Sequence, residues 1–189
     1  MKRMILVGPP GAGKGTQAAF ICRELNIPHI STGQIFRENM EQETELGESA
    51  KAYISRGEYV PDSVTNPMVK VRLDNPDARE GFLLDGYPRT VSQAKVLDEM
   101  LADRGRKLDL VLQITADNEA VVERLLKRAE IEHRPDDTEE VIRHRLDVYQ
   151  ELTEPLMSFY EEAGLLVKVD GNGSIDEVSD RIKAILEAK

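Results

Sequence analysis

The stretch Gly8-Pro9-Pro10-Gly11-Ala12-Gly13-Lys14-Gly15-Thr16 follows directly after the apolar run Met4-Ile5-Leu6-Val7. Glycines have no Cβ, so successive backbone N–H groups of such a stretch can turn inward and surround an anion. The helix that follows offers its positive N-terminal end, and Lys14 adds a full charge. The pattern predicts a strand, a phosphate-binding loop and a helix, with a nucleoside triphosphate as the ligand.

Lys14 and Thr16 distinguish this loop from an ordinary turn rich in glycine and proline. A cation at a helix start is disfavoured by the helix dipole by about 0.3 to 1 kcal/mol, so Lys14 requires a compensating anion. In the usual phosphate loop Ser or Thr follows the lysine directly, but here Gly15 intervenes and the hydroxyl comes at Thr16. We therefore expect Thr16 to contact a magnesium ion bound to the triphosphate largely through water.

A second stretch, Gly81-Phe82-Leu83-Leu84-Asp85-Gly86-Tyr87-Pro88-Arg89-Thr90, begins as a buried strand and ends in a turn with an acid and an arginine. In a parallel sheet the ligand lies beyond the carboxyl ends of the strands. Asp85 and Arg89 should therefore emerge beside the phosphate loop. The sequence predicts one site built from two distant segments, with Asp85 as a further contact of the magnesium ion.

The composition is that of an ordinary globular chain with an acidic excess. The 189 residues include 40% hydrophobic side chains and carry a net charge of −10. Binding to nucleic acid depends on a basic surface, so we expect no nucleic-acid partner. No apolar run reaches the ~18 residues that span a bilayer, and Met1-Lys2-Arg3 leads straight into a strand. We expect a cytoplasmic protein with no membrane partner.

Cysteine and histidine are too few and too scattered for a structural zinc site, so none is expected. The chain has one cysteine, Cys22, and its histidines are His29, His133 and His144. Cys22 is interpreted as a small buried hydrophobe. Anionic substrates are compatible with the net charge because exposed acids are screened beyond about 8 to 10 Å. Binding then requires a local gathering of cations, for which the candidates are Lys14, Arg37, Arg89, Arg124, Arg128, Arg134 and Arg145.

Strand-like apolar runs alternate with helical patterns, which predicts an α/β fold with a five-stranded parallel sheet flanked by helices. The strand-like runs are Met4–Val7, Pro28–Ile30, Phe82–Leu84, Leu110–Ile114 and Leu165–Val169. Helical spacing covers Gln17–Leu25, Ile35–Met40, Gly47–Ser55, Pro67–Leu73, Val91–Leu101, Glu119–Arg128, Thr138–Glu162 and Ile175–Leu186. Pro155 should kink or interrupt the longest of these helices. The absence of repeats and linkers indicates a single domain over residues 1–189.

These segments, together with Ser31-Thr32-Gly33 and Arg134-Pro135-Asp136-Asp137, closely resemble the adenylate kinases, within the nucleoside-monophosphate kinase family. The resemblance implies a phosphate-loop fold with a small AMP-binding lobe at residues 31–60 and a short lid at residues 129–137. It also implies reversible transfer of the γ-phosphoryl group of MgATP to AMP, giving two ADP, by a monomer that interconverts adenine nucleotides. The expected partners are ATP and AMP, and the expected cofactor is the Mg²⁺ bound with ATP.

The same resemblance assigns roles to individual residues. Expected catalytic residues are Lys14, Arg89, Arg124, Arg128, Arg134 and Arg145. Expected ATP-binding residues are Gly11, Ala12, Gly13, Lys14, Gly15, Thr16, Arg128 and Gly173. Expected AMP-binding residues are Thr32, Arg37, Glu58, Tyr59, Val60, Gly86, Tyr87, Pro88, Arg89, Gln93, Arg134 and Arg145, and the expected metal contacts are Thr16 and Asp85.

Three assignments have competing interpretations. Thr90-Val91-Ser92-Gln93 fits a capping box, in which the Gln93 side chain only satisfies a backbone donor, whereas the resemblance places Gln93 against adenine. Arg124 and Arg128 lie on one helix face, which from spacing alone favours a solvated charged surface; the resemblance instead places both beside the transferring phosphoryl group. Ser31 and Asp137 are equally well explained as helix caps.

The predicted chemistry needs no general base, because the attacking phosphate oxygen is already ionised at neutral pH. The site must align the two substrates, neutralise charge and exclude water, which predicts closure of the lobe and the lid. Two rival functions remain open. A pyrimidine monophosphate kinase would share the phosphate site and differ at the base, and a phosphate-loop binding module would hold ATP without transferring its phosphate.

Overall fold

The computed structural model describes residues 2–134 and 138–189. Its centre is a five-stranded sheet with the order β2-β3-β1-β4-β5, in which every pairing is parallel. The strands are β1 (Arg3–Val7), β2 (His29–Ser31), β3 (Phe82–Asp85), β4 (Leu110–Thr115) and β5 (Leu166–Asp170). The predicted α/β class and the five-stranded parallel sheet are confirmed.

Helices connect the strands and cover the sheet. They are α1 (Lys14–Leu25), α2 (Thr32–Glu41), α3 (Glu45–Ser55), α4 (Asp62–Leu73), α5 (Val91–Ala102), α6 (Asn118–Glu132), α7 (Glu139–Val148), α8 (Glu154–Glu162) and α9 (Ile175–Ala188), with a 3₁₀ turn at Pro76–Ala78 and a π-helical segment at Tyr149–Thr153. Within the described ranges, no helix combines the length and the apolar character needed to cross a membrane.

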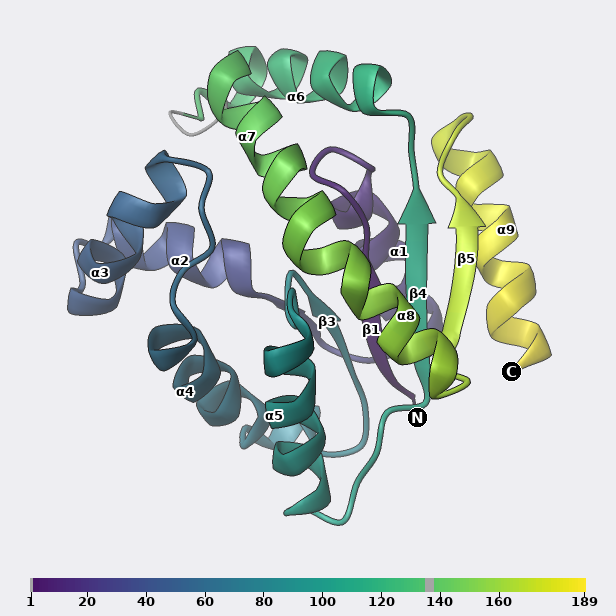
Figure 1. Cartoon of the computed structure of the whole chain (residues 1–189). Helices are drawn as coiled ribbons and strands as arrows, with labels where there is room; N and C mark the ends of the chain where they lie inside the picture. The colour runs from purple at the N-terminus through teal and green to yellow at the C-terminus, as the bar shows by residue number, and fades with distance from the viewer. Residues whose placement is uncertain (1, 135–137) are drawn as a thin grey trace.

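The sheet is the middle layer between two groups of helices (Figure 1). Successive side chains of a strand point to opposite faces. In β1, Ile5 and Val7 join a core with α4, α5 and α8, whereas Met4 and Leu6 join a second core with α1 and α9. The continuous apolar strands of the sequence are thus explained by burial on both faces, as expected for a parallel sheet.

Two smaller apolar clusters lie outside the sheet. Phe36, Ala50 and Val60 pack together in the lobe formed by α2, α3 and the segment that follows. Helices α6 and α7 share a separate cluster that includes Leu125 and Ile142. In Figure 1, α2 and α3 extend to one side of the sheet and α6 crosses beyond the strand ends. Each of these parts therefore has a small core of its own.

The register of the sheet places the two motif segments side by side. Leu6 of β1 pairs with Asp85 of β3, and each strand ends within one residue of that pair. The phosphate loop begins at Gly8 and the turn that carries Arg89 begins at Gly86, so both loops leave the same edge of the sheet. The prediction that these distant segments emerge beside one another is confirmed.

Several helix boundaries differ from the predicted ones. Helix α4 begins at Asp62 and includes Pro67, because Thr65 and Val69 continue one buried face across the proline. Helix α6 continues from Arg128 to Glu132, so the break predicted at residue 129 begins later in the chain. Residues 135–137, which include the predicted cap Asp137, lie outside the described part of the structure.

The long helix predicted at residues 138–162 is divided, as its proline suggested. Helix α7 ends at Val148, the π-helical segment follows, and Pro155 occupies the first turn of α8. A proline is tolerated there because the first N–H groups of a helix have no partner within it. Tyr149 and Thr153, the first and last residues of the π-helical segment, are both buried.

Candidate active site

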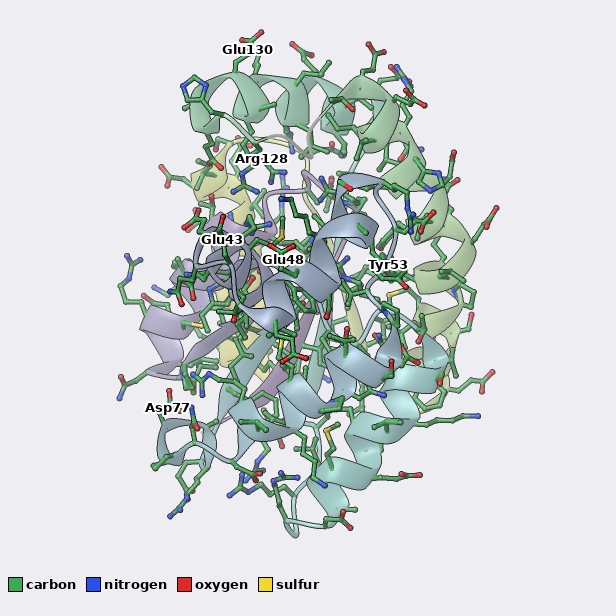
Figure 2. The ribbon with its side chains drawn as sticks, turned by 90° about the vertical axis from the view of Figure 1, so that its left-hand side faces the viewer. Glu43, Glu48, Tyr53, Asp77, Arg128 and Glu130 are labelled. Atoms are coloured by element: carbon green, nitrogen blue, oxygen red, sulfur yellow. The ribbon has the colours of Figure 1, made fainter. Side chains whose placement is uncertain are left out.

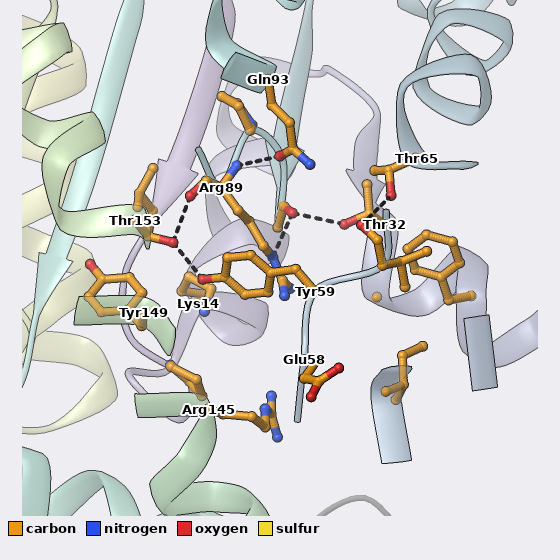
Figure 3. Close-up of a pocket in the computed structure, with 18 of the residues that line it drawn as sticks. Lys14, Thr32, Glu58, Tyr59, Thr65, Arg89, Gln93, Arg145, Tyr149 and Thr153 are labelled. Carbon is orange, nitrogen blue, oxygen red and sulfur yellow. Dashed lines mark hydrogen bonds between the residues drawn. The ribbon is translucent and has the colours of Figure 1, made fainter. Parts of the chain in front are cut away.

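An open cleft of about 1020 Å³ lies at the carboxyl edge of the sheet. It is bounded by the phosphate loop, the start of α2, the segment before α4, the turn after β3, and α7 with the π-helical segment (Figure 3). The predicted site residues that line it are Lys14, Thr32, Arg37, Glu58, Tyr59, Val60, Gly86, Pro88, Arg89, Gln93 and Arg145. A cleft lined by cations is suited to a phosphorylated ligand.

Charge in the cleft is the opposite of charge in the whole chain. Lys14, Arg37, Arg89 and Arg145 line the cleft, and Glu58 is the acid among its described lining residues. Glu58 is exposed and its carboxylate accepts a hydrogen bond from Arg56 at 3.0 Å. Four of the seven predicted cations thus gather in the cleft of a chain whose net charge is −10, while Arg124, Arg128 and Arg134 lie outside its lining.

The phosphate loop has a backbone that glycine makes possible. Gly11 and Gly13 have φ values of 78° and 85°, in the left-handed region. The N–H of Ala12 donates to the carbonyl of Pro9 at 3.1 Å, which closes the turn. A Cβ on Gly11 would lie 2.7 Å from Cγ of Leu125, so α6 packs directly on the loop. The loop is thus held between Leu125 of α6, which packs on it, and the start of α1, into which it leads.

Lys14 folds back onto the loop that it follows. Its Nζ donates to the carbonyl oxygens of Gly8 at 3.1 Å and Pro9 at 3.3 Å. Desolvation lowers its pKa to about 8 although the charge of Asp85 opposes the shift, and the charges of Arg89, Arg145 and Arg128 lower it further. The ammonium group is thus held among other cations, and a polyanion in the cleft would relieve that repulsion.

Asp85 is a buried acid next to these cations. Its carboxylate is 3.1 Å from Nε2 of His29. Burial raises its pKa, but the hydrogen bond from His29 and the positive charges of Lys14, His29 and Arg89 outweigh burial, so the pKa of Asp85 is held below its usual range. Asp85 is therefore a carboxylate at neutral pH, which a metal ligand must be.

The candidate metal contacts form a sparse set. Thr16 is exposed in the first turn of α1, and Asp85 is the neighbouring acid on the sheet edge. In the described residues, His, Cys, Asp and Glu side chains form no group of three or more that could hold a metal ion. This arrangement suits Mg²⁺, which keeps several waters and is held by substrate phosphates with one or two protein oxygens.

Arg89 is held at its main chain and at its side chain. Its N–H donates to Oε1 of Gln93 at 2.8 Å, and its carbonyl accepts from the hydroxyl of Thr153 at 2.8 Å. Its Nε donates to the carbonyl of Gly86 at 2.8 Å, and its guanidinium carbon lies 4.9 Å from the centre of the Tyr59 ring. Figure 3 shows these groups around Arg89 in the cleft.

Thr32 joins the lobe to the turn after β3. Its side chain is buried and its hydroxyl donates to the carbonyl of Gly86 at 3.0 Å. Gly86 has a φ of 84°, and a Cβ there would lie 2.7 Å from the Thr32 oxygen. The neighbouring residue Ser31 caps α2, since its oxygen accepts from the N–H of Gln34 at 3.2 Å. The capping interpretation of Ser31 is confirmed.

Gln93 does not complete the predicted capping box, and its contact with adenine stays a prediction. Thr90 caps α5 by accepting from the N–H of Gln93 at 3.1 Å, which is one half of a capping box. The Gln93 side chain does not supply the other half: Oε1 accepts from Arg89 N–H, and Nε2 donates to Asp62 at 2.8 Å. Gln93 is 3% exposed and lines the cleft. Its amide keeps one hydrogen and one lone pair for a further partner.

The arginines of α6 lie outside the lining of the cleft. Figure 2 shows Glu130 on the outer side of α6 and Arg128 on its inner side, and the charge of Arg128 acts on Lys14. Arg124 is exposed, one residue from the Leu125 that packs on the phosphate loop. Arg134 forms an ion pair with Glu132 and does not line the cleft.

The remaining predicted residues flank the cleft. Gly11, Ala12 and Gly13 precede α1, and Gly15 and Thr16 lie in its first turn. Tyr87 is 1% exposed and its hydroxyl donates to Asn66 at 2.7 Å, so its side chain points into the core instead of toward a ligand. Gly173 lies in the loop before α9, which is tied to α1 because Gln17 donates to the carbonyl of Ile175 at 3.2 Å.

The sequence did not point to several residues that shape the site. Thr153 and Tyr149 line the cleft, Asp62 holds Gln93, and His29 holds Asp85. Thr153 and Tyr149 lay within a predicted helix on the same buried face as Leu146 and Leu156, and helical spacing does not distinguish a side chain that lines a cleft from one that only packs in the core. His29 is the first residue of β2, the strand that leads into Ser31 and Thr32. Its place on a strand next to the one that carries Asp85 was the available signal that it could bond to this acid.

Comparison with known proteins gives a consistent result over nearly the whole chain. The model of the family described as adenylate kinase matches residues 6–165. The adenylate kinase of Kocuria rhizophila is 58% identical over 187 residues, which cover 99% of this chain and 100% of the relative. That of Thermobifida fusca is 57% identical over 187 residues, with 99% of each chain covered. That of Renibacterium salmoninarum is 57% identical over 187 residues, covering 99% and 97%.

Proposed function

The chain belongs to the adenylate kinase family and catalyses the reversible transfer of the γ-phosphoryl group of ATP to AMP, and we propose that the cleft at the sheet edge is where this reaction takes place. The observation that carries the proposal is the meeting of Lys14, Arg89 and Arg145 around one cleft in an acidic protein. The phosphoryl group would pass between a phosphate site at Lys14 and a second one at Arg89.

The ATP site of the proposal is built on the phosphate loop. Backbone N–H groups of residues 11–16 and the N-terminus of α1 would surround the β- and γ-phosphates, with Lys14 as their point charge. Arg124 and Arg128 would approach from α6, whose Leu125 packs on Gly11. Gly173, in the loop tied to α1 through Gln17, would lie on the nucleoside side.

The AMP site of the proposal is built on the turn after β3 and on the lobe of residues 31–60. Arg89 and Arg37 would bind the phosphate, with Thr32 beside them at Gly86. Gln93 would contact adenine through the hydrogen and lone pair that its partners leave unused, with the main chain of residues 58–60 and Gly86 to Pro88 along the nucleotide. Arg134 and Arg145 would complete the charge around the transferring group.

Mg²⁺ bound with ATP fits the residues that are present. Asp85 would hold it from the sheet edge and Thr16 from the first turn of α1, through water or directly. When bound, the ion neutralises charge on the triphosphate. The chain's own contribution at this point is a buried carboxylate whose ionised form is favoured by His29, Lys14 and Arg89.

No side chain has to move a proton in the proposed mechanism, because the nucleophile is an ionised phosphate oxygen of AMP. The lysine and arginines align the two nucleotides and stabilise the charge of the passing phosphoryl group. Water is the competing acceptor, so closure must exclude it. We propose that the lobe at residues 31–60, which contains the Phe36 cluster, and the lid at residues 129–137 perform that closure.

The proposal includes a monomer that acts in the cytoplasm, as the resemblance to the adenylate kinases implies. A coupled assay of ADP formation with AMP, CMP, UMP and GMP tests the function directly. Turnover with AMP at least tenfold above that with the other monophosphates is the expected result. Preference for CMP or UMP would support a pyrimidine monophosphate kinase, and ATP binding without turnover would support a binding module.

A further inference from the structure

Thr153 is a buried polar residue at the meeting point of three segments. It ends the π-helical segment, is 2% exposed and lines the cleft. Its hydroxyl donates to the carbonyl of Arg89 at 2.8 Å and lies 2.5 Å from the hydroxyl of Tyr59. The three residues are separated by 30 to 94 positions in sequence, so the contact joins the end of the lobe, the turn after β3 and the C-terminal half of the chain.

Local helix structure does not account for the Thr153 hydroxyl. Thr153 occupies the N-cap position of α8, where a threonine usually accepts from a backbone N–H, but here the side chain makes no capping hydrogen bond. A threonine within a helix often donates to a carbonyl four residues earlier, whereas this hydroxyl donates to Arg89 across the cleft wall. The side chain is directed toward the site instead of toward its own helix.

The hydrogen bonds of this cluster have a defined direction. A threonine hydroxyl carries one hydrogen, and that hydrogen is used for the carbonyl of Arg89. Tyr59 must therefore donate to Thr153, which gives the chain Tyr59 to Thr153 to the Arg89 carbonyl (Figure 3). A valine at residue 153 would leave both the Tyr59 hydroxyl and the Arg89 carbonyl without this partner.

Tyr59 transmits the constraint to the Arg89 side chain. Its ring lies 4.9 Å from the Arg89 guanidinium carbon, a distance typical of a cation–π contact. Nε of Arg89 is bonded to Gly86, while Nη1 and Nη2 form no hydrogen bond with the described residues. The network thus fixes the plane of the guanidinium and leaves the paired donors that bind a phosphate in two-point fashion.

We propose that Thr153 is a positioning residue for AMP: through Tyr59 and the Arg89 main chain it holds the Arg89 guanidinium ready for the AMP phosphate. The proposal rests on the proposed function, in which Arg89 binds that phosphate. Pre-organisation of this kind lowers the cost of ordering the side chain on binding. The effect should therefore fall on AMP and leave ATP, which is held by the phosphate loop, nearly unchanged.

Steady-state kinetics of Thr153→Val, Thr153→Ser and Tyr59→Phe test the proposal, with AMP and ATP varied separately and a thermal melt for each variant. Thr153→Val keeps the shape of the side chain and removes both hydrogen bonds of the hydroxyl, so it should raise the KM for AMP about tenfold. Its KM for ATP should stay within about twofold. Thr153→Ser should restore the KM for AMP, and Tyr59→Phe should raise it in the same direction.

Thr115→Val is the matched control, because Thr115 also donates its hydroxyl to a backbone carbonyl, that of Val169 at 3.3 Å, and does not line the cleft. It should lower the melting temperature without raising the KM for AMP. The inference is overturned if Thr153→Val lowers the melting temperature as Thr115→Val does and leaves the KM for AMP unchanged. Should Thr153→Val not fold, the same decision rests on Tyr59→Phe.

Arg89→Ala separates this inference from the proposed function. If Arg89→Ala leaves the KM for AMP unchanged, the proposed phosphate site is wrong whatever Thr153 does. If Arg89→Ala raises it, Thr153→Val should add less than threefold in the Arg89→Ala background, since a positioning residue acts through its target. A full tenfold effect of Thr153→Val in that background would show that Thr153 acts independently of Arg89 and would contradict the inference.

Discussion

Leu125 of α6 packs so closely on Gly11 of the phosphate loop that a Cβ on Gly11 would lie 2.7 Å from Cγ of Leu125. The loop thus has α6 as a fixed wall, and the arginines on either side of Leu125 are brought near the loop without being part of it. Arg128 follows Leu125 by three residues, close to one helical turn. The contact explains how a helix outside the cleft can influence Lys14.

Gly11→Ala should destabilise the protein and weaken ATP binding more than the backbone strain alone would. Gly105→Ala is the matched control: Gly105 has a φ of 65° and open space where a Cβ would lie. The control should cost about 1 to 2 kcal/mol, the cost of a left-handed conformation. Thermal melts and ATP titrations should show a larger loss for Gly11→Ala. Equal losses, with ATP affinity unchanged, would mean that the loop is not held by α6.

The affinity for ATP should fall as pH rises through about 8, because desolvation lowers the pKa of Lys14 to about 8. Below this pH the ammonium form predominates and binds phosphate; above it the free enzyme loses that charge. The kcat/KM for ATP reports ionisations of the free enzyme, so it should fall above a pH of about 8. The decrease of kcat should begin at a higher pH, because phosphate bound beside Lys14 favours its ammonium form.

Lys14→Arg provides the control for that profile, since a guanidinium stays charged over the same range. Titrations of ATP between pH 7 and pH 9.5 should give a nearly constant Kd for this variant, even though its turnover is low. A wild-type Kd that is equally flat would show that Lys14 does not titrate in the free enzyme.

Gln93→Leu should raise the KM for AMP by about 5- to 150-fold and leave the KM for ATP nearly unchanged, since a lost buried contact costs about 1 to 3 kcal/mol. Discrimination against CMP, UMP and GMP should also weaken. Thr90→Ala is the control, because it removes the cap of α5 and keeps the side-chain amide of Gln93 with its partners Arg89 and Asp62. It should lower stability by about 1 kcal/mol and keep the preference for AMP. Gln93→Leu behaving like Thr90→Ala would leave Gln93 a structural residue.

Arg128→Ala and Arg134→Ala should each reduce kcat by about 100-fold or more with little change in melting temperature, because the loss of a charge aimed at the transition state affects rate most. Arg143→Ala is the control, because Arg143 lies on the surface of α7 and pairs with Glu119 of α6 and Glu139 of α7. The variant should change neither kcat nor melting temperature measurably. Kinetics with ATP and AMP varied separately distinguish the roles. A rise in KM at constant kcat would indicate uniform binding and contradict closure-dependent catalysis.

Local signals in the sequence were sufficient for the sheet and the two motif loops. The run before Gly8 and the run before Asp85 are apolar on both faces, and their shared edge follows from parallel pairing alone. Helix ends were harder to predict. Pro67 suggested that a helix begins there, but α4 begins at Asp62 and continues through the proline. Burial of Thr65 and Val69 on one face outweighs the helix hydrogen bond that a proline cannot donate.

Side-chain partners across the cleft could not be read from local patterns. The Gln93 amide bonds to Asp62, 31 positions earlier, so a capping box predicted from spacing was only half formed. Thr153 lies on the buried face that Leu146, Tyr149 and Leu156 share at helical spacing, but spacing could not tell that its hydroxyl donates to the carbonyl of Arg89. Such contacts depend on how lobe, turn and helix meet in space, and they decide how the predicted residues are held.

The turnover of Lys14→Ala tests the central claim, that the loop after β1 binds the phosphates that are transferred. The variant should fold, with a melting temperature within a few degrees of the wild type, because the loop backbone and the Leu125 contact are unchanged. Its kcat for ADP formation from ATP and AMP should fall by roughly 10³- to 10⁵-fold, the range for a charge at phosphoryl transfer. Lys127→Ala, which removes an exposed lysine paired with Glu123 on α6, should keep wild-type turnover. A folded Lys14→Ala variant with near-normal turnover would contradict the account.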